Sequence, residues 1–497
     1  MLFYFIESKG GIKMSVLEII ENNIKKENKM VLPIKVLPLN ASQEQALKEV
    51  ENNTLTTIIG AAGTGKSSVI TAIASHFIMT GRKVLIVSKS DHAVDVITDK
   101  LNGLGAGLVA LRGGKQQSQI LLASHIMDLL EGKIDLNNNE KSNLIKYLFN
   151  QNEKEGKKLL KTKRINALKD LLNDYDSRKN LLIQAKSCIA KKKTQRDKIM
   201  ATIDFTPILN AIPCWCVTTM EISSVLPLKE EMFDLVICDE SSEVDIASFL
   251  PCAFRAKKAV VVGDDKQLKS LNFMDNKKNK SFLTKYEIPA DLQMVWDYRQ
   301  NSLFDFCQYY TQKCIMLNEQ YRMPENIFKF NNDTFYGGMI KSNKKEEKGA
   351  LTKVFVDGNT NVNKTFNFEE CEAIITYLKK WLKDNKNNNK SIAILSMFNS
   401  QVDLIKKAVQ EIIDFEEIEK HNIHIGTANT SQGNEWDYVL ISWVIDNNCK
   451  HQSLTFANNP ERLNVITSRG REKVINFYSK NNMGNCLLGK YLGSIKE

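Results

Sequence analysis

A short β-prone run at residues 55–59 leads directly into a glycine-rich octapeptide, and this junction constrains the fold more than any other feature of the chain. The octapeptide reads Gly-Ala-Ala-Gly-Thr-Gly-Lys-Ser over residues 60–67. Its glycines let backbone N–H groups curl around a polyphosphate, while the lysine reaches the outer phosphates and the serine hydroxyl can ligate Mg²⁺. The pattern therefore predicts a strand–loop–helix unit that binds a nucleotide. The candidate binding residues are Gly60, Gly63, Thr64, Gly65, Lys66 and Ser67.

Two further apolar runs end in polar residues that would complete such a site. Residues 235–238 precede Asp239 and Glu240, and residues 259–262 precede a polar turn at 263–268. An open α/β sheet collects its ligand site at the carboxyl ends of its strands. Asp239 can hold the Mg²⁺ shell there, and Glu240 can polarise the water that attacks a γ-phosphate. Together with the loop, this pair predicts hydrolysis of the nucleotide and not its binding alone.

The bulk composition is that of a soluble globular protein. The 497 residues exceed what a single core supports, and the charged fraction of 25% beside a hydrophobic fraction of 43% is ordinary. No stretch approaches the roughly 20 apolar residues of a membrane span, and the N-terminus is too short and then too polar for a signal peptide. Ten scattered cysteines include no C-x-x-C pair, which argues against a zinc ribbon. Buried thiols in a reducing compartment, by default the cytoplasm, are expected.

The order of strand-like and helix-like runs divides the chain into segments. Strand and helix patterns alternate, stop near residue 103 and resume near residue 211, and a second α/β unit without a phosphate loop of its own follows. Its strand candidates are residues 392–395, 423–425, 438–441 and 474–478. The expected segments are an N-terminal helix and linker (1–38), a first core (39–102 and 211–312), a helical insertion (103–210) and a second core (313–497).

The insertion lacks strand-type runs and carries most of the net charge. Residues 131–200 contain 18 Lys or Arg against 9 Asp or Glu, a difference of +9 in a chain whose net charge is +10. A basic surface of this size suits a polyanion, with residues 191–193 as candidate phosphate contacts, whereas a solvated lysine-rich helix pair is the alternative. An apolar stripe predicts an antiparallel hairpin that stands off the core and could dock a protein partner. The stripe is Ile165, Leu168, Leu172, Tyr175 and Leu182.

Six motifs in a fixed order resemble those of the Upf-like branch of superfamily 1 helicases. The resemblance extends from Leu39 to Tyr478 and is interrupted by the insertion. It implies two RecA-like parallel-sheet cores with ATP and Mg²⁺ in the cleft between them. The richness in Lys, Asn and Ile also suits an AT-rich bacterial or phage genome. The motifs are residues 60–67, 239–240, 263–268, 318–324 (Asn-Glu-Gln-Tyr-Arg-Met-Pro), 431–437 (Ser-Gln-Gly-Asn-Glu-Trp-Asp) and 464–469 (Asn-Val-Ile-Thr-Ser-Arg).

The resemblance assigns roles to individual residues around the nucleotide. Gln43 would read the adenine edge, and Gln267 would sense the γ-phosphate. Arg322 and Arg469 would be arginine fingers from the second core. This agrees with the chemistry, because a planar guanidinium supplies bidentate positive charge to the developing γ-phosphate oxygens. A surface salt bridge is the alternative for both arginines, and it is a stronger alternative for Arg471.

Other matched residues would connect the nucleotide to a nucleic-acid strand. Glu370 would approach the ribose, and Gln432, Gly433 and Glu435 would link the nucleotide to the strand. Small hydroxyls and backbone amides at helix starts suit strand phosphates, although ordinary helix capping is the alternative. The candidates for these contacts are Ser90, Asp91, Thr218 and Thr219.

The function that the resemblance implies is an ATP-dependent helicase or translocase that moves 5′-to-3′ on single-stranded DNA or RNA. Two alternatives stay open: a nucleic-acid-stimulated ATPase that strips proteins from a strand, and an ATP-gated clamp in a larger complex, such as one for defence. The choice between DNA and RNA depends on contacts to the 2′-hydroxyl that no motif reveals. Four departures from the family pattern leave every catalytic group in place. They are Asn429, Glu243, Ser468 and Gly470.

Overall fold

The computed structural model describes residues 34–104, 109–114, 116–134, 136, 153–190, 193–200, 202–270, 274–311, 313–361, 365–479 and 486–496. The chain forms two compact units. Unit 1 extends to Leu317 except for residues 61–64 and 266–268, which belong to unit 2 together with Asn318–Glu497. Most of the expected N-terminal helix, and residues 191–192 of the insertion, lie outside the described residues.

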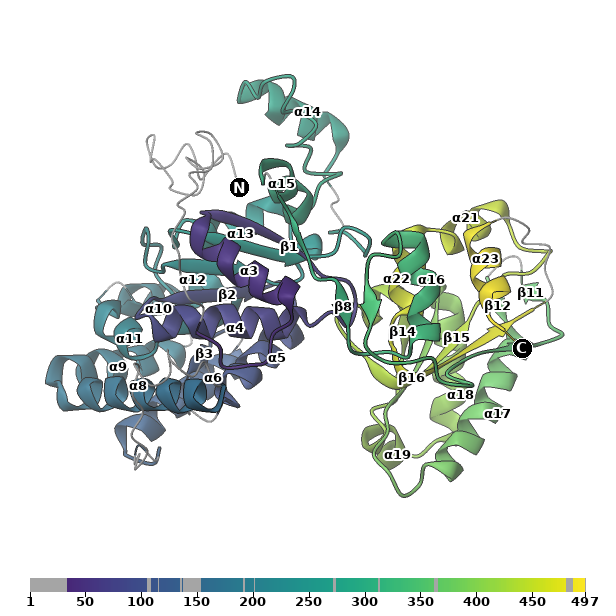
Figure 1. The fold of residues 1–497 in the computed structure, drawn as a ribbon, viewed down its shortest axis with the longest axis horizontal. Coiled ribbons are helices and arrows are strands. Elements are labelled where there is room, and N and C mark those ends of the chain that lie inside the picture. Colours follow the sequence, from purple (N-terminus) through teal and green to yellow (C-terminus); the bar gives the residue numbers. More distant parts are fainter. Residues whose placement is uncertain are drawn as a thin grey trace. The chain divides into compact units, whose positions relative to one another are not determined.

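Unit 1 is built on a parallel sheet of seven strands in the order β3-β4-β2-β5-β6-β1-β7 (Figure 1). Every strand pairing in it is parallel. The central strands are short apolar runs, as expected for a sheet that is buried on both faces. The strands are β1 (Leu55–Ile59), β2 (Val84–Ser88), β3 (Ala110–Arg112), β4 (Cys214–Thr218), β5 (Leu235–Cys238), β6 (Ala259–Gly263) and β7 (Ile315–Met316).

Helices cover both faces of this sheet. Successive strand residues point to opposite faces, so Val84 and Ile86 of β2 join one hydrophobic layer while Leu85 and Val87 join the other. The helices are α3 (Ala41–Asn52), α4 (Lys66–Met79), α5 (Asp91–Asn102), α6 (Gln116–Leu130), α8 (Glu153–Asn173), α9 (Tyr175–Cys188), α10 (Lys193–Met200), α11 (Phe205–Ala211), α12 (Ile222–Val225), α13 (Ile246–Ala253), α14 (Asn276–Lys285) and α15 (Leu303–Tyr310), with a 3₁₀ turn at Ser241–Glu243.

The insertion packs on the core, so the prediction of a hairpin that stands off it is wrong. Helix α8 places Leu159 and Leu160 in the same hydrophobic layer as α4, and Leu168 in the layer on the other face of the sheet. Lys163 Nζ also donates to the Met79 carbonyl oxygen at the end of α4, at 2.6 Å. Residues 110–112, assigned to the insertion from the sequence, form the edge strand β3.

The predicted apolar stripe of the insertion is broken after Leu172. Asp174 N-caps α9 by accepting a hydrogen bond from Ser177 N–H at 2.8 Å, so one helix ends and another begins inside the stripe. Tyr175 is consequently 77% exposed and Leu182 is 38% exposed, while Leu168 is buried. A change of helix direction resets the 3.6-residue phase, which a continuous spacing of threes and fours cannot reveal.

Unit 2 contains a second parallel sheet, in the order β10-β16-β15-β13-β14. All four predicted strand runs lie wholly or largely in it, and the predicted fold class of two RecA-like parallel-sheet α/β cores is confirmed. The strands are β10 (Leu351–Phe355), β13 (Ile392–Ser396), β14 (His424–Thr427), β15 (Trp436–Ser442) and β16 (Gly470–Tyr478), beside the small pairs β8 (Glu319–Gln320) with β9 (Lys341–Ser342) and β11 (Thr360–Asn361) with β12 (Phe366–Asn367).

The helices of unit 2 flank its sheet. Trp381 and Ile374 of α17 pack with Ile405 of α18 against strand residues such as Leu440. The helices are α16 (Glu325–Phe335), α17 (Phe368–Asp384), α18 (Asn399–Ile412), α19 (Phe415–Lys420), α20 (Ala428–Ser431), α21 (His451–Ala457), α22 (Pro460–Thr467) and α23 (Leu487–Ser494). Among the described residues of either unit, no helix combines the length and the apolar character needed to cross a lipid bilayer.

Candidate active site

The phosphate loop joins β1 to α4 in a backbone conformation that requires glycine. Gly63 and Gly65 have φ angles of +80° and +85°, in the left-handed region that side chains disfavour. Gly60 N–H donates to the Gly263 carbonyl oxygen at 2.9 Å, which ties the start of the loop to the end of β6. Thr64, also in the loop, is buried, and its hydroxyl donates to a carbonyl of the same turn at 2.8 Å. The loop is therefore a preformed turn with the N-terminus of α4 at its end.

Gln43 lies against this loop. A Cβ atom added to Gly65 would lie 2.8 Å from Gln43 Nε2, so the two residues are in close contact. The Gln43 side chain also belongs to a capping box of α3, in which its Oε1 accepts from Asn40 N–H at 3.1 Å while Asn40 Oδ1 accepts from Gln43 N–H at 2.9 Å. The residue that was predicted to read the adenine edge thus also fixes the start of α3 beside the loop.

The structure brings Lys66, Asp239 and Glu240 together at the carboxyl edge of the unit 1 sheet. Lys66 is the first residue of α4; its Nζ donates to the Gly60 carbonyl oxygen at 3.0 Å and lies 3.8 Å from Glu240 Oε1. Glu240 N–H donates to Asp239 Oδ1 at 2.9 Å. Glu240 has a φ angle of +49°, which is uncommon for a residue with a side chain and marks a strained turn at this position.

Asp239 is a buried acid in a cluster with excess negative charge. Burial and the neighbouring Glu240 charge together raise its pKa to about 7, against the opposing effect of the Lys66 charge. A divalent cation would offset this charge. The Asp239 carboxylate and the hydroxyl of half-buried Ser67 are hard oxygen donors of the kind that Mg²⁺ takes, and phosphate oxygens and water would complete its shell. No cluster of three or more His, Cys, Asp or Glu that could hold a metal occurs in the described parts of the chain. The donors present fit a nucleotide-bound magnesium ion.

Two serines that the sequence reading passed over fix the turn that carries this acidic pair. Ser241 Oγ donates to the Val262 carbonyl oxygen at 2.8 Å, and Ser242 Oγ accepts from Asp264 N–H at 2.8 Å. A Cβ atom added to Gly263 would lie only 2.8 Å from each of these two hydroxyl oxygens. The end of β6 therefore needs glycine. The sequence did contain a signal for this contact. It has two small hydroxyl residues directly after the acidic pair and a neighbouring strand run that ends in glycine.

Three of the predicted residues of unit 2 lie close together. Arg322 Nε forms an ion pair with Glu435, and Arg322 Nη1 lies 3.5 Å from the Ser468 carbonyl oxygen, next to Arg469. Arg469 is buried at the end of α22, where its Nε donates to the Val465 carbonyl oxygen at 2.8 Å. The two guanidinium groups are therefore held near each other within unit 2.

Arg471 behaves as the salt-bridge alternative predicts. Its Nη2 lies 2.8 Å from Asp437 Oδ1, and its Nη1 lies 3.6 Å from Glu435 Oε1.

The remaining predicted positions have varied exposure. Gly433 is exposed with a φ angle of +78°, Gln432 is half-buried at the end of α20, and Gln267 is buried after β6.

Glu370 is a correction to the sequence reading, because its carboxylate is enclosed in the interior of unit 2. The residue is fully buried. Its Oε2 accepts from Ser442 Oγ at 2.6 Å and from Val444 N–H at 3.0 Å, and its Oε1 accepts from Ser479 Oγ at 3.2 Å. Val444 has a φ angle of +66°, a rare conformation for a β-branched residue. Glu370 therefore stabilises a strained turn after β15, and its buried carboxylate is not exposed at the surface of unit 2, as the predicted ribose contact would need.

The residues predicted to contact strand phosphates lie at the carboxyl edge of unit 1, and one of them caps a helix. Ser90 N-caps α5, with its Oγ 3.4 Å from Ala93 N, and Asp91 Oδ1 lies 2.7 Å from Arg112 Nη2. Thr218 Oγ1 lies 2.8 Å from a carboxylate oxygen of Glu221. Thr219 is the exception, since its buried Oγ1 has no hydrogen-bond partner within the described structure. Ser90 therefore has the capping role that was the stated alternative, and the strand contact of these four residues stays a prediction.

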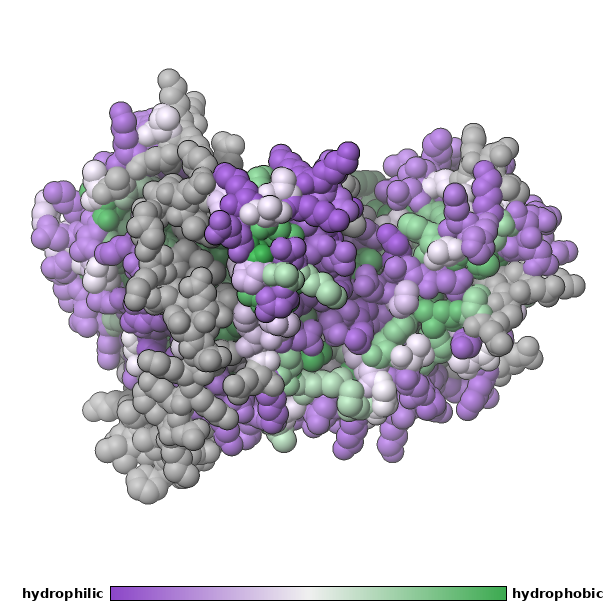
Figure 2. Space-filling model, turned by 90° about the horizontal axis from the view of Figure 1, so that it is seen from above, coloured by the Kyte–Doolittle hydropathy of each residue, from purple (hydrophilic) through white to green (hydrophobic). Residues whose placement is uncertain are grey.

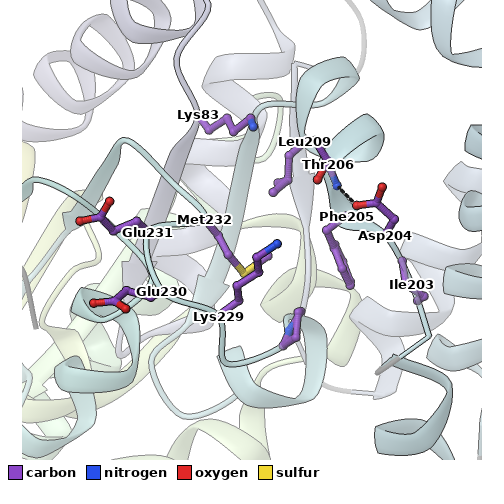
Figure 3. A pocket seen from close by; sticks show the side chains of 11 residues that line it. Lys83, Ile203, Asp204, Phe205, Thr206, Leu209, Lys229, Glu230, Glu231 and Met232 are labelled. Atoms are coloured by element: carbon purple, nitrogen blue, oxygen red, sulfur yellow. Dashed lines mark hydrogen bonds between the residues drawn. The ribbon is translucent and has the colours of Figure 1, made fainter. Parts of the chain in front are cut away.

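A cavity of about 190 Å³ lies at the opposite, amino-terminal edge of the unit 1 sheet (Figure 3). Phe205, Leu209 and Met232 line it, with Lys83 just before β2 and Lys229 across from it. Because the strands are parallel, this edge is the one away from the phosphate loop and the acidic pair. The cavity is therefore separate from the nucleotide site.

Comparison with known proteins gives a consistent set of similarities. Two family models, each described as an AAA domain, match residues 38–273 and 299–480. A "Regulator of nonsense transcripts 1 homolog" of Arabidopsis thaliana is 24% identical over 91% of this chain and 34% of its own length. A "DNA polymerase alpha-associated DNA helicase A" of Schizosaccharomyces pombe is 23% identical over 94% of this chain and 66% of its own length.

The chain spans about a third of the length of several curated relatives that it matches. Among solved structures, "Complex structure of Arterivirus nonstructural protein 10 (helicase) with DNA" is similar with 9% sequence identity and a TM-score of 0.39. That similarity covers 90% of this chain and 64% of the viral one.

Proposed function

Because this chain belongs to the Upf-like branch of superfamily 1 helicases, we propose that it is an ATP-driven helicase or translocase that acts on nucleic acid. The observation that carries the proposal is the group formed by Lys66, Asp239 and Glu240 at the end of β5, next to the preformed phosphate loop. Lys66 and Glu240, 3.8 Å apart at a strand end, supply two groups that hydrolysis of a nucleoside triphosphate uses, a phosphate-binding lysine and a carboxylate that can activate water.

Each group of the site has a chemical task in this proposal. Backbone N–H groups of the loop and Lys66 bind the β- and γ-phosphates, and Glu240 orients the attacking water and accepts its proton. Asp239 and Ser67 would hold a magnesium ion, which would neutralise charge on the phosphate oxygens. Arg322 and Arg469 supply further positive charge to the γ-phosphate.

The nucleic-acid substrate of the proposal is a single strand, along which the protein moves in the 5′-to-3′ direction. Family membership supports this direction, and Ser90, Asp91, Thr218, Thr219 and Gln432 are the proposed strand contacts. Thr219 is the most favoured of them, since its buried hydroxyl has no hydrogen-bond partner among the described residues. Whether the strand is DNA or RNA is decided by a competition between matched strands that differ in the 2′-hydroxyl.

Strand-stimulated ATP turnover, followed by strand displacement, tests this proposal. A helicase hydrolyses ATP faster when single strands are added and releases a labelled strand from a partial duplex with a 5′ overhang. Stimulated turnover without release, together with removal of a protein block, would indicate a stripping ATPase. Turnover that is insensitive to single strands would contradict the proposal and favour a clamp in a larger complex.

A further inference from the structure

We propose that α14 is a phosphate-contacting arm that extends the nucleic-acid surface of unit 1 beyond the loops after β2 and β4. The inference rests on the proposed function, since it names a second contact surface for the same strand. Helix α14 (Asn276–Lys285) follows β6 in the chain and reads Asn-Lys-Lys-Asn-Lys-Ser-Phe-Leu-Thr-Lys. None of the motifs identified in the sequence includes it.

The exposed side of α14 carries four lysines. Lys277, Lys278, Lys280 and Lys285 are all exposed, and the ten residues of the helix contain no acid. At 100° per residue the four lysines fall within one arc of about 160° on the helix surface. Lys278 Nζ lies 6.0 Å from the centre of the Phe282 ring, and Lys285 Nζ lies 4.7 Å from that of Tyr286. The helix therefore presents four cations on one side, and two of them lie beside aromatic rings.

The opposite side of α14 is anchored, so the basic side has a fixed orientation. Asn279 and Leu283 are buried there, and Asn279 Nδ2 donates to Asp297 Oδ1 at 2.9 Å. The segment that returns from α14 is held in turn, because the Trp296 ring lies edge-on to Phe306 of α15 with centroids 4.8 Å apart. In Figure 2, which looks down on this part of unit 1, hydrophilic residues cover most of the surface, with small hydrophobic areas among them.

Contacts within unit 1 join this segment to the candidate strand contacts. Tyr298 OH donates to Asp245 Oδ1 at 3.0 Å, and Asp245 caps α13 just after the acidic pair. Ser248 of α13 lies with its Oγ 3.8 Å from Met220 Sδ, and Met220 directly follows Thr219 in the loop after β4. Met220 is 76% exposed, so its apolar side chain is available on this surface. The loop after β4, the start of α13 and the α14 segment thus form one connected edge.

The chemistry of α14 suits a nucleic-acid backbone better than a base-reading role. Lysines are flexible point charges without the planar fork that recognises base edges, so they bind phosphates irrespective of sequence. Aromatic rings beside them can stack on unpaired bases, a combination found in surfaces that bind single strands. The expected partner is therefore a single strand bound through its phosphates.

Neutralising three of these lysines tests the proposal. The variant Lys277→Gln, Lys278→Gln, Lys280→Gln is compared with Lys379→Gln, Lys380→Gln, Lys383→Gln, which removes the same charge from exposed positions of α17 in unit 2. Affinity for a labelled mixed-sequence single strand is measured across a salt series. The α14 variant should bind roughly tenfold more weakly at physiological salt, and the slope of log affinity against log salt should flatten by about 0.7 for each lost contact. The α17 variant should retain wild-type affinity and slope.

Three results would overturn the inference. Wild-type affinity and salt slope in the α14 variant would show that the lysines are only a solvated face. An equal loss in both variants would show a general effect of net charge. Weaker binding of an acidic peptide by the α14 variant than by wild type, with an unchanged strand affinity, would assign the surface to a protein. If the wild-type chain binds no single strand at all, the proposed function itself fails, and this outcome is distinct from a defect confined to the α14 variant. An unchanged thermal unfolding midpoint confirms that the variant is folded.

Discussion

Asp239 in unit 1 and Glu370 in unit 2 are buried carboxylic acids whose pKa values burial raises to about 7, yet their surroundings differ. Asp239 lies at the end of a strand beside a second carboxylate and a lysine that begins the phosphate-loop helix. Glu370 is enclosed by two serine hydroxyls and a backbone N–H group, with no cation among these partners. The first arrangement leaves negative charge that a metal ion could offset, whereas the second is already satisfied by hydrogen bonds.

The comparison shows that burial and a raised pKa do not by themselves identify a functional carboxylate. A perturbed pKa is a probabilistic indicator, because structural networks shift pKa values as well. The two acids differ in the groups that surround their carboxylates. Glu370 stabilises a strained turn at Val444, while Asp239 has its backbone turn fixed by Ser241 and Ser242 and keeps its carboxylate near Lys66.

The largest expected effect is that of Glu240→Gln. This change removes the proposed base without altering the phosphate contacts, so turnover of ATP should fall roughly 10³- to 10⁴-fold while affinity for ATP stays near wild type. Steady-state turnover and equilibrium binding of a fluorescent ATP analogue measure the two quantities. Lys66→Ala serves as the contrast, because it should weaken both. Near-normal turnover in the Glu240 variant would remove Glu240 from the catalytic role.

Arg469→Ala is expected to reduce turnover on the order of 10³-fold, the contribution of an arginine that stabilises charge on a transferred phosphoryl group. Arg471→Ala is the matched control two residues away, and it should cost much less because Arg471 pairs with Asp437. The turnover rates of both variants, measured with saturating ATP and single strands, show which arginine contributes to catalysis. A larger loss at Arg471 would mean that the functional arginine of this motif has been misassigned.

Glu370→Gln should change stability and its pH dependence, with turnover close to wild type. The folded pKa of about 7 lies above the ordinary value of 4.5, so the folded state binds the proton more tightly and stability falls as pH rises between these values. The slope is at most about 1.4 kcal/mol per pH unit in this window, and glutamine should abolish this contribution. Urea unfolding of wild type and variant at pH 5 and pH 7.5 measures the difference. An unchanged pH slope would contradict the buried, proton-binding role.

The smallest expected effect is that of Gln43→Ala. It should weaken ATP binding several-fold and lower the stability of α3 by about 1 kcal/mol, because it also removes the capping box with Asn40. Comparison of ATP with GTP separates the two roles, since loss of an adenine contact reduces the preference for ATP. If stability falls while the preference between ATP and GTP is unchanged, Gln43 acts only as a cap beside Gly65.

The sequence predicted well those features that depend on local pattern. The phosphate loop between β1 and α4, and the apolar runs that became β5, β6 and the strands of unit 2, are continuous stretches whose chemistry is visible residue by residue. The approach of Lys66 to Glu240 also followed from the rule that parallel strands end at one edge. Ser241 and Ser242 were within reach of the same reasoning, because they directly follow the acidic pair.

Features that depend on packing were not predicted. Strand β3 has three residues, too few for a periodic pattern, and it is defined by its pairing with β4. The contact of Leu159 and Leu160 with the layer of α4 depends on where the insertion returns to the core, which spacing does not specify. Glu370 was a different case: it lies one turn before the buried Ile374 and Leu378 of α17, so helical periodicity already placed it on the buried face. The prediction of a ribose contact for Glu370 followed the family resemblance and not this helical pattern.

Single-turnover hydrolysis of bound Mg²⁺–ATP in the paired variants Asp239→Asn and Glu370→Gln tests whether Asp239, and not Glu370, is the functional buried carboxylate. Both changes replace a buried carboxylate of raised pKa by its amide, so they differ only in where the carboxylate lies. We expect a loss of at least about 10²-fold in Asp239→Asn, because the magnesium ligand is removed, and a rate within a few-fold of wild type in Glu370→Gln. Equal losses in the two variants, or a larger loss at Glu370, would contradict this expectation.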